Sequence, residues 1–417
     1  MTLGHPSVET DRSPLHGLLV VDLSRALAGP HATMMLGDLG ARVIKIEAPE
    51  GGDDSRGWGP PFVGSDDQTE STYFLSANRN KESIVLDLKD GGDRDVFLSL
   101  VDEADVLVEN YRPGVLERLG LAIETLAARN PRLIVLSITG FGHDGPEGGR
   151  AGYDQIVQGE AGLMSLTGSA PDDPQRVGVP IADLLSGIYG AFGILAALHE
   201  RESTGLGTIV RTSLLASIIG VHAFQGTRWT VAEEVGHAQG NQHPSIAPYG
   251  LFRCRDGAIQ MALGSEHLWN RFCQGFELDP RAEPYASNAE RVNNRTSLIA
   301  LIEQSFSAWD SLPLLERLSE IGVPAGKVRN LEEVYGWGQT LSQGLLVNVE
   351  HSTLGTVALP GPPLRFFRSD GNEVTPRTHQ PPPTLNQHGK DIRGWVSGMA
   401  MSNTTALADP PTSIGAN

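Results

Sequence analysis

The sequence predicts an α/β fold in which a large domain with an open parallel, Rossmann-like sheet is joined to a smaller α+β domain. Short apolar runs alternate with helical patterns over residues 17–138, which is typical of a parallel sheet with helices on both faces. The connections are short, which favours right-handed βαβ units. Near residue 225 the alternation stops, and a hairpin followed by helical patterns predicts the smaller domain.

The first βαβ unit begins with an apolar run at residues 17–22, bounded by turn residues, which predicts a buried strand. Pro30 suits the first turn of the helix that follows, and Gly40 ends that helix. Residues 41–47 are expected to form the next strand, parallel to the first.

Downstream of this unit, residues 49–73 are rich in Pro, Gly and Asp, and we expect a long loop there. Apolar runs predict further strands, and apolar residues at helical spacing predict helices. The strands are expected at residues 83–88, 105–109 and 133–138, and the helices at residues 93–103 and 115–119.

A long apolar helix is expected behind Asp183, because Pro180 ends the preceding segment. An Asp at the N-cap accepts backbone N–H bonds and feels the helix dipole, and both effects favour the ionised carboxylate. Glycine inside a helix costs roughly 1 kcal/mol, so Gly187, Gly190 and Gly193 indicate that something packs very close. The helix carries almost no charge and is expected to be buried. Asp183 is either a structural cap or a reactive group at the floor of a site.

After about residue 225 the pattern of alternating strands and helices ends. A β-hairpin is predicted to turn at Asp256-Gly257. Helical patterns follow at residues 267–276, 296–309 and 312–321. The expected bounds are 1–14 for a polar lead, 15–224 for the large domain, 225–330 for the small domain, 331–397 for a return to the large domain and 398–417 for a disordered tail.

Composition narrows the function. The 417 residues carry a net charge of −18 and a pI of about 5.1, which argues against a nucleic-acid partner because phosphate binding requires a basic face. Cys254 and Cys273 lack metal or disulfide spacing, so the reducing cytoplasm is the expected location. The N-terminus has no apolar signal region. No uncharged apolar run reaches the ~18 residues that a membrane span requires, so no membrane association is expected.

Two basic clusters are candidate anion sites. One comprises residues 78–81 with Lys89, and the other comprises Arg112 and Arg118, which follow a predicted strand end. Ligands bind to parallel sheets at such ends, so these residues indicate either a phosphate site or ordinary solvated charge. A glycine-dense stretch at residues 139–154 allows backbone to approach a ligand, or is simply a flexible loop.

Several common sites are not expected. The loop of the first βαβ unit lacks the GxGxxG glycines, so NAD is not predicted, although Glu47 ends the second strand where an acidic residue would meet a ribose. The sequence has no HExxH, GxSxG or P-loop motif, and His143 has no partner at metal spacing. We therefore expect no metal.

The order of several motifs resembles one family, the family III CoA-transferases, over residues 15–395. The matching pieces are residues 28–30, 40–47, 78–89, 104–114, 140–146, 152–154, Asp183 with its glycine helix, 247–250, 322–324 and 354–363. This group includes formyl-CoA and carnitine-type CoA-transferases and, on the same fold, the 2-methylacyl-CoA racemases.

The resemblance implies that Asp183 is the catalytic carboxylate. It would attack an acyl-CoA thioester, pass through an aspartyl anhydride to an enzyme-bound CoA thioester, and deliver CoA to a carboxylic acid. Backbone N–H groups near Asp183 would stabilise the oxyanion. The family's positions for CoA fall on Ala26, Leu27, Ala28, Leu86, Lys89, Asn110, Tyr111, Arg112, Arg118 and Leu119. Lys89, Arg112 and Arg118 would meet phosphates, whereas Ala48 stands where related members place a basic residue.

Tyr153 and Asp154 complete the implied site and separate two activities. Racemases of this fold place a His before the Asp, and Tyr, with a pKa near ~10, is a poor proton acceptor at neutral pH. A transferase is therefore favoured over a 2-methylacyl-CoA racemase, and a non-catalytic CoA-binding protein remains a third reading. Residues 240–243 lie where transferases carry a mobile glycine loop but hold one glycine, and Glu266 falls near a racemase glutamate. The resemblance also implies an interlocked homodimer.

Overall fold

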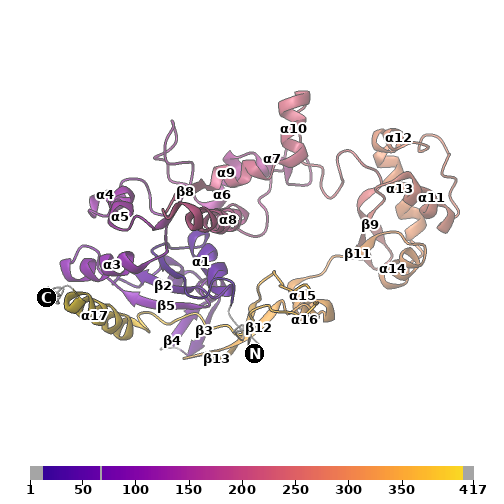
Figure 1. Ribbon diagram of the computed structural model, residues 1–417. Coiled ribbons are helices and arrows are strands. Elements are labelled where there is room, and N and C mark those ends of the chain that lie inside the picture. The colour runs from indigo at the N-terminus through magenta and orange to yellow at the C-terminus, as the bar shows by residue number, and fades with distance from the viewer. Residues whose placement is uncertain (1–12, 66–67, 407–417) are drawn as a thin grey trace, which may run out of the picture. The chain divides into compact units, whose positions relative to one another are not determined.

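The computed structural model describes residues 13–65 and 68–406, and these form two units (Figure 1). The first unit contains the described residues up to Ala161, then Val179–Ala223, and the chain from Ser342 onward. The second contains Gly162–Gly178 and Phe224–Leu341. Residues 162–178, which we assigned to the large domain, thus pack with the second unit. The expected polar lead lies almost wholly outside the described residues.

A six-stranded parallel sheet forms the centre of the first unit, as predicted. Its spatial order is β5-β2-β1-β6-β7-β8. The strands are β1 (Leu19–Asp22), β2 (Arg42–Glu47), β5 (Lys81–Val85), β6 (Val106–Glu109), β7 (Ile134–Thr139) and β8 (Ile209–Ser213). The chain winds outward from β1 through β2 and β5, and then in the other direction from β6. The carboxyl ends of β1 and β6 therefore flank a topological switch point, where open α/β sheets bind ligands.

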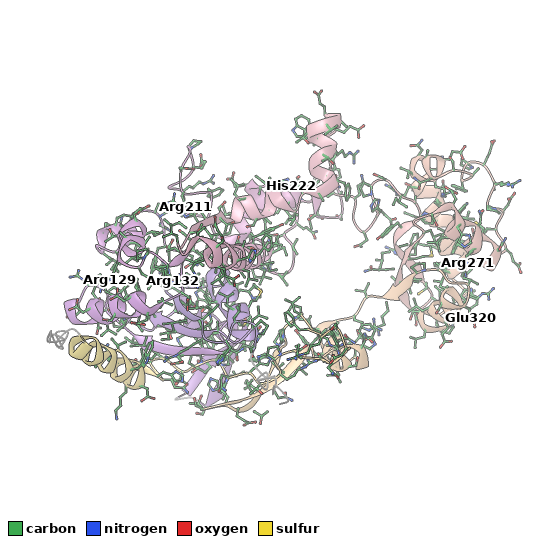
Figure 2. All side chains as sticks on the ribbon, in the orientation of Figure 1. Arg129, Arg132, Arg211, His222, Arg271 and Glu320 are labelled. Carbon is green, nitrogen blue, oxygen red and sulfur yellow. The ribbon has the colours of Figure 1, made fainter. Side chains whose placement is uncertain are left out.

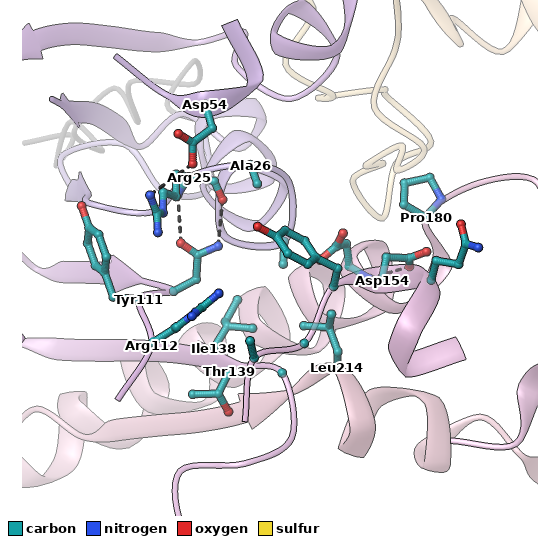
Figure 3. A pocket seen from close by; sticks show the side chains of 18 of the residues that line it. Arg25, Ala26, Asp54, Tyr111, Arg112, Ile138, Thr139, Asp154, Pro180 and Leu214 are labelled. Atoms are coloured by element: carbon teal, nitrogen blue, oxygen red, sulfur yellow. Dashed lines mark hydrogen bonds and ion pairs between the residues drawn. The ribbon is translucent and has the colours of Figure 1, made fainter. Parts of the chain in front are cut away.

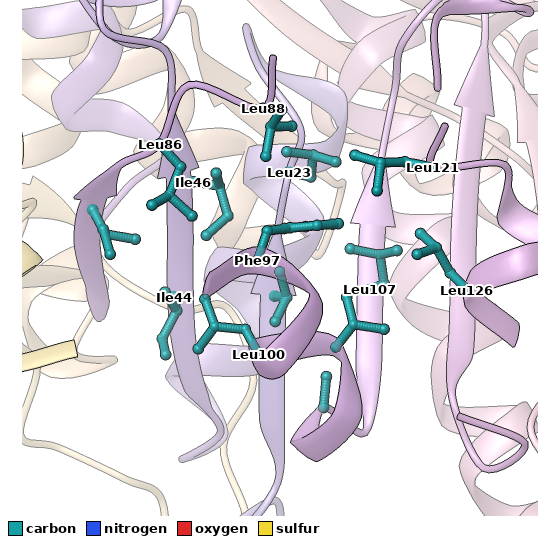
Figure 4. Packing of buried hydrophobic residues seen from close by; sticks show 14 of the residues in the cluster. Leu23, Ile44, Ile46, Leu86, Leu88, Phe97, Leu100, Leu107, Leu121 and Leu126 are labelled. Atoms are coloured by element: carbon teal, nitrogen blue, oxygen red, sulfur yellow. The ribbon is translucent and has the colours of Figure 1, made fainter. Parts of the chain in front are cut away.

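Helices cover both faces of this sheet. Figure 4 shows Phe97 and Leu100 of α3 packed over Ile44, Ile46 and Leu107 of the strands. Alternate strand residues face the opposite side, where α1 and α8 pack together. The helices of this unit are α1 (Ala28–Asp38), α2 (Thr72–Ser76), α3 (Gly91–Glu103), α4 (Val115–Arg118), α5 (Ile123–Arg129), α6 (Asp154–Glu160), α8 (Ile181–Thr204), α9 (Leu214–Gly220) and α17 (Gly389–Ala406).

The three glycines of α8 lie where the sequence predicted close packing. A Cβ at Gly187 would lie 2.7 Å from the carbonyl oxygen of Ala28, and one at Gly190 or Gly193 would lie 2.6 Å from a side chain of the sheet. The expectation that the whole helix is buried is wrong, because Phe192 is 69% exposed and Leu195 is 37% exposed. By length and composition alone α8 is apolar enough to cross a membrane, but its glycine face packs on α1 and the sheet.

The long loop expected over residues 49–73 is instead structured. It contains the 3-10 helix η1 (Asp54–Gly57), the hairpin β3 (Phe62–Ser65) and β4 (Gln68–Ser71), and α2. The charged residues that suggested a loop turn inward: Arg56 pairs with Glu47 at 2.7 Å, and Asp53 is buried. The short helix α6 was also missed. The expected disordered tail begins within α17, which continues to Ala406.

The second unit is the predicted α+β domain, and its hairpin pairs Gly257 with Cys254 beside the predicted turn. Its core contains the side chains of Phe252, Trp269, Phe272 and Phe306. Arg271 of α11 and Glu320 of α14 mark two of its helices in Figure 2. Its elements are α7 (Leu163–Leu166), α10 (Ala223–Ala232), β9 (Tyr249–Cys254), β10 (Gly257–Ala262), α11 (Glu266–Gly275), α12 (Asn288–Asn293), α13 (Arg295–Phe306), α14 (Ser311–Glu320), β11 (Ala325–Lys327), α15 (Leu331–Tyr335) and α16 (Gly338–Ser342).

The chain then returns to the first unit through an antiparallel pair, β12 (Leu346–His351) and β13 (Gly355–Pro360). This pair packs against α2 through Leu75, Val349 and Leu359. The terminal helix α17 lies beside α3 and β5, so residues far apart in the sequence complete one core.

Candidate active site

A cavity of about 290 Å³ opens at the topological switch point of the sheet (Figure 3). Loops that follow β1, β6 and β7 line it, together with the start of α8. In Figure 3, Tyr111 and Arg112 lie at one side of this cavity and Asp154 and Pro180 at the other. Eight of the residues named from the sequence line it: Ala26, Ala28, Asn110, Tyr111, Arg112, Tyr153, Asp154 and Asp183.

Asp183 is not the N-cap that the sequence suggested. Pro180 occupies the N-cap position, and Asp183 lies in the first turn of α8. The cap is supplied by Asp154, the first residue of α6, whose Oδ1 accepts hydrogen bonds from the amides of Ala182 (2.7 Å) and Asp183 (3.4 Å). Its other oxygen accepts from Gln158 at 2.7 Å. The expected oxyanion donors next to Asp183 are therefore already engaged.

The charge state of Asp183 also differs from the expectation. Burial, followed by the nearby Asp154 carboxylate, raises the pKa of Asp183 to about 7. No residue within the described chain donates a hydrogen bond to its carboxylate oxygens. The unfavourable charge environment outweighs the helix dipole, because the dipole's free amides are taken by Asp154. Asp183 thus titrates close to neutral pH, which is typical of carboxyls that take part in acid–base or nucleophilic chemistry.

The loop between β1 and α1 forms another wall of the cavity. Ala26 has a φ of 66°, a left-handed conformation that is uncommon for a residue with a side chain. Asn110 holds the loop from the end of β6: its Oδ1 accepts from the Arg25 amide at 2.9 Å and its Nδ2 donates to the Arg25 carbonyl at 2.8 Å. Both polar groups of this side chain therefore serve the loop.

Three arginine side chains line the cavity, and they differ in their partners. Arg25 pairs with Asp54 at 3.1 Å, and Arg150 pairs with Glu160 at 2.6 Å. Within the part of the chain that the structure describes, the Arg112 guanidinium has no ion-pair or hydrogen-bond partner. Arg112 is therefore the lining guanidinium that remains available to an anionic ligand.

Sequence reasoning missed several lining residues, including Arg25, Asp54, Trp58, Tyr73 and Arg150. Tyr73 is informative, because burial and then the charges of Asp183 and Asp154 raise its pKa to about 12. Its hydroxyl is thus a neutral hydrogen-bond donor near both carboxyls. The rings of Trp58 and Tyr73 pack edge to face, with their centroids 4.9 Å apart. Arg25 and Arg150 belong to motifs that we noted, so their positions were visible but not their roles.

Five residues predicted to contact CoA do not line the cavity. Leu27 and Leu86 are buried, Leu86 within the core under α3, and Leu119 packs against the same core. Lys89 and Arg118 are exposed at the surface. Among the described residues, no group of three or more His, Cys, Asp and Glu side chains is placed to hold a metal ion. The expectations of no metal and no NAD stay predictions.

The first basic cluster has a different role from the one considered. Arg79 is buried and pairs with Asp38 at 2.5 Å, and Lys81 is buried with its Nζ 2.9 Å from Asp22. These cations stabilise the fold beneath the cavity. Residues 240–243 and Glu266 belong to the second unit, where the Glu266 carboxylate pairs with Arg291 at 2.5 Å.

Comparisons with known proteins agree with this geometry. The model of CoA-transferase family III matches residues 15–389. The chain is 39% identical to the succinyl-CoA:glutarate CoA-transferase of Homo sapiens, over 93% of this chain and 87% of the relative. It is 38% identical to the acetyl-CoA:oxalate CoA-transferase of Acetobacter aceti, over 92% of this chain and 95% of the relative. The crystal structure of a CAIB/BAIF family protein from Brucella suis is similar, with a TM-score of 0.81 and 38% identity over 92% of this chain and all of that one.

Proposed function

The chain belongs to CoA-transferase family III, and on this basis we propose that it moves CoA from an acyl-CoA donor to a small dicarboxylic acid with Asp183 as the nucleophile. The observation that carries the proposal is Asp183 itself. It is a half-buried carboxyl with a pKa of about 7, and it lines the cavity at the topological switch point of the sheet. At neutral pH a substantial fraction is ionised while the carboxylate lacks hydrogen-bond donors, which favours nucleophilic attack.

In the proposed mechanism, an oxygen of the Asp183 carboxylate attacks the thioester carbon of the donor. The C–S bond breaks, the CoA thiolate leaves, and an acyl-aspartyl anhydride remains. The thiolate then attacks Cγ of Asp183 and expels the donor's acid as a carboxylate, which leaves a thioester between CoA and Asp183. The acceptor carboxylate repeats these two steps in reverse order, so acyl-CoA is formed and ionised Asp183 returns.

Side chains around Asp183 support this sequence. Asp154 fixes the first turn of α8 and raises the pKa of the nucleophile. Tyr73 offers a neutral hydroxyl near the developing oxyanion, in place of the amides that Asp154 occupies. Tyr111 and Arg112 line the cavity at the end of β6, where the donor would lie.

The dicarboxylate acceptor is proposed from two considerations. The relatives named above act on glutarate and oxalate, each of which carries two carboxylates. One carboxylate would react, and the second requires a cationic partner. The cavity provides Arg112, whose planar guanidinium suits bidentate recognition of a carboxylate, or of a phosphate of CoA. Lys89 and Arg118 are exposed at the surface of the first unit. We propose that they bind the remaining phosphates of CoA.

A racemase on the same fold is the alternative. It requires a second base, and Tyr153, which stands in the position of the racemase His, is 64% exposed and is a phenol. A non-catalytic CoA-binding protein would have no need of a carboxyl with a pKa near 7. We further propose a homodimer, because an apolar groove is exposed on the first unit, and a cytoplasmic location, because the two cysteines lack disulfide spacing. The groove is lined by Met35, Leu39, Ile188, Phe192, Leu195, Leu364 and Phe366.

The proposed function is tested by intact-protein mass spectrometry after incubation with succinyl-CoA, acetyl-CoA and other acyl-CoAs. We expect a CoA adduct that borohydride reduces and that peptide mapping places on Asp183. Asp183→Asn is the matched control and must form no adduct. If no donor gives an adduct, while the α-proton of a 2-methylacyl-CoA exchanges with deuterium, the racemase is the correct function.

A further inference from the structure

The loop between β1 and α1 is held by a set of side chains that take no step in the proposed chemistry, among them Asn110, which the family resemblance implied as a CoA contact. Ala26 carries a positive φ, and such a backbone is strained for a residue with a Cβ. Strained conformations of this kind persist only where surrounding contacts determine them. The contacts of Ser24, Arg25 and Ala26 therefore indicate what fixes this wall of the cavity.

Two buried charged residues bind the main chain of this loop. The Asp53 Oδ1 accepts a hydrogen bond from the Ala26 amide at 3.0 Å, and its Oδ2 lies 2.7 Å from the Lys45 Nζ. Lys45 in turn donates to the Ser24 carbonyl at 2.9 Å. The side chains of Lys45 and Asp53 are 0% and 1% exposed. With Asn110, which binds the backbone amide and carbonyl of Arg25, they form what we call the loop clamp.

The clamp connects two walls of the cavity. Arg25, Ala26 and Ala28 line it from the β1 loop, whereas Asp54 and Trp58 line it from the segment that starts at Asp53. Asp53 is fixed in its own segment, because Oδ1 also accepts from the Ser55 amide at 2.9 Å and the Ser55 hydroxyl at 2.8 Å. One carboxylate thus sets the separation of the two walls.

Stability alone is a poor explanation for this arrangement. Bringing two charges into the interior carries a desolvation penalty, and well-packed apolar residues often stabilise a fold as much or more. The ion pair differs from an apolar substitute in one respect, since it directs hydrogen bonds to a carbonyl and an amide of one loop. Burial lowers the pKa of Lys45, but nearby carboxylates, chiefly those of Asp53 and Asp22, together raise it by more. Lys45 therefore stays a cation across the physiological pH range.

We propose that Lys45, Asp53 and Asn110 are positioning residues that hold the β1 loop in the shape that receives CoA, an inference that rests on the proposed function. Asp183 lies on α8, on a separate wall, and receives no contact from the clamp. Loosening the clamp therefore weakens donor binding and leaves the chemical step at a saturated site largely intact. This predicts a change in Kd and KM without a matching change in kcat.

The test measures CoA binding by isothermal titration calorimetry, and turnover of the best donor, for Asp53→Ala, Lys45→Met and Asn110→Ala. We expect the Kd for CoA and the donor KM to rise about tenfold or more, and kcat to change less than about threefold. Arg42→Met is the control. Arg42 lies on the same strand as Lys45 and pairs with Glu82 at 2.7 Å, but it does not touch the loop, so its Kd should stay within about twofold of wild type.

Thermal unfolding separates this role from a merely structural one. If Asp53→Ala or Lys45→Met fails to fold, Asn110→Ala decides, because Asn110 lies near the surface. Folded variants with an unchanged Kd, or with a kcat loss that exceeds the KM rise, would overturn the clamp while the proposed function stands. Wild-type protein that binds no CoA would reject the proposed function, and the clamp with it.

Discussion

Asp183 illustrates how one carboxyl can be reactive because its surroundings oppose its charge. Two features raise its pKa: burial in the protein removes much of its contact with water, and Asp154 lies close enough to repel its charge. The same Asp154 stabilises the first turn of α8 through the Ala182 amide. The two aspartates therefore differ: Asp154 binds the backbone, whereas Asp183, the proposed nucleophile, has no hydrogen-bond donor among the described residues.

Asp183→Asn is expected to lower kcat more than about 10³-fold, because the amide cannot replace the attacking carboxylate. It should also stabilise the fold at alkaline pH. The folded pKa of about 7 lies above the ordinary value of 3.8, so the native state binds more protons and wild-type stability falls as pH rises between these values. The variant avoids this loss and should be more stable by about 1–3 kcal/mol at pH 8. Urea denaturation at pH 4 and pH 8 measures it, and an equal effect at both pH values would contradict the assignment.

Asp154→Asn separates the cap from the charge. The amide oxygen still accepts from the Ala182 amide, but the repulsion of Asp183 is removed, so the pKa of Asp183 should fall. The acidic limb of the kcat/KM profile, which reports groups in the free enzyme, should move to lower pH. We expect the ratio of kcat/KM at pH 6 to kcat/KM at pH 8 to rise several-fold, which corresponds to a fall of roughly half a unit or more in the pKa of Asp183. Gln158→Ala, which removes a neutral hydrogen-bond partner of Asp154 and leaves the charge of Asp154 in place, is the control. A limb that stays in place in Asp154→Asn would show that another group titrates there.

At this scale the sequence indicated which residues to examine but not what each one does. Asp183 was visible through its helix and through the family resemblance. We expected Asp183 to cap the N-terminus of α8, but the capping carboxylate belongs to Asp154 on α6. Only the fold brings α6 and the start of α8 together. The basic residues Arg79 and Lys81 were visible as charge, but their buried carboxylate partners lie far away in sequence.

At the scale of the elements, the close packing of α8 on α1 and the sheet depends on three glycines that have no side chain. These glycines allow α1 to pack so closely that the carbonyl of Ala28, a residue of the cavity wall, lies against Gly187. The packing of two helices thus sets the position of the loop that precedes α1.

Gly187→Ala tests this packing. Its Cβ would lie 2.7 Å from a backbone oxygen and 3.2 Å from His31, so α1 must shift. We expect a net destabilisation of about 1–3 kcal/mol despite the higher helix propensity of alanine, together with a raised KM for the donor. Gly394→Ala is the matched control, because that glycine lies exposed in α17 with open space around it. It should stabilise by up to about 1 kcal/mol. Equal effects of the two changes in urea denaturation would exclude the close contact.

Hydrophobic periodicity predicted the central strands of the sheet and most of the long helices, because each buries a regular apolar face. It failed for residues 49–73, where the ordered structure depends on charge rather than on apolar spacing. Arg56 reaches Glu47 and Asp53 reaches Lys45, so polar residues that resemble a solvated loop form buried contacts. The helix α17 was not predicted at all, and its last turns contain the small and polar residues that we assigned to a disordered tail.

For the whole molecule, the strand order explains why the cavity lies where it does. The chain leaves β1 in one direction and returns beside it as β6, so two loops diverge at their carboxyl ends and leave space between them. The sequence predicted the parallel sheet, but the pairing of β1 with β6, and hence the hydrogen bonds between Arg25 and Asn110, follow from tertiary contacts that periodicity does not encode.

The exposed face of α8 leads to the last prediction. Phe192 is 69% exposed and Leu364 is 58% exposed, and both line the apolar groove of about 190 Å³ described above. Contiguous apolar surface of this kind is typical of an interaction site, and the proposed homodimer would bury it. Analytical ultracentrifugation of the wild type should give twice the chain mass of 44.6 kDa. Phe192→Asp combined with Leu364→Ser should shift the equilibrium towards the monomer by at least about tenfold, because charge and polarity are placed in an apolar contact. Leu312→Asp, at an equally exposed apolar residue of α14 in the second unit, should leave the mass unchanged. A monomeric wild type, or equal dissociation by both changes, would show that this groove does not hold the dimer together.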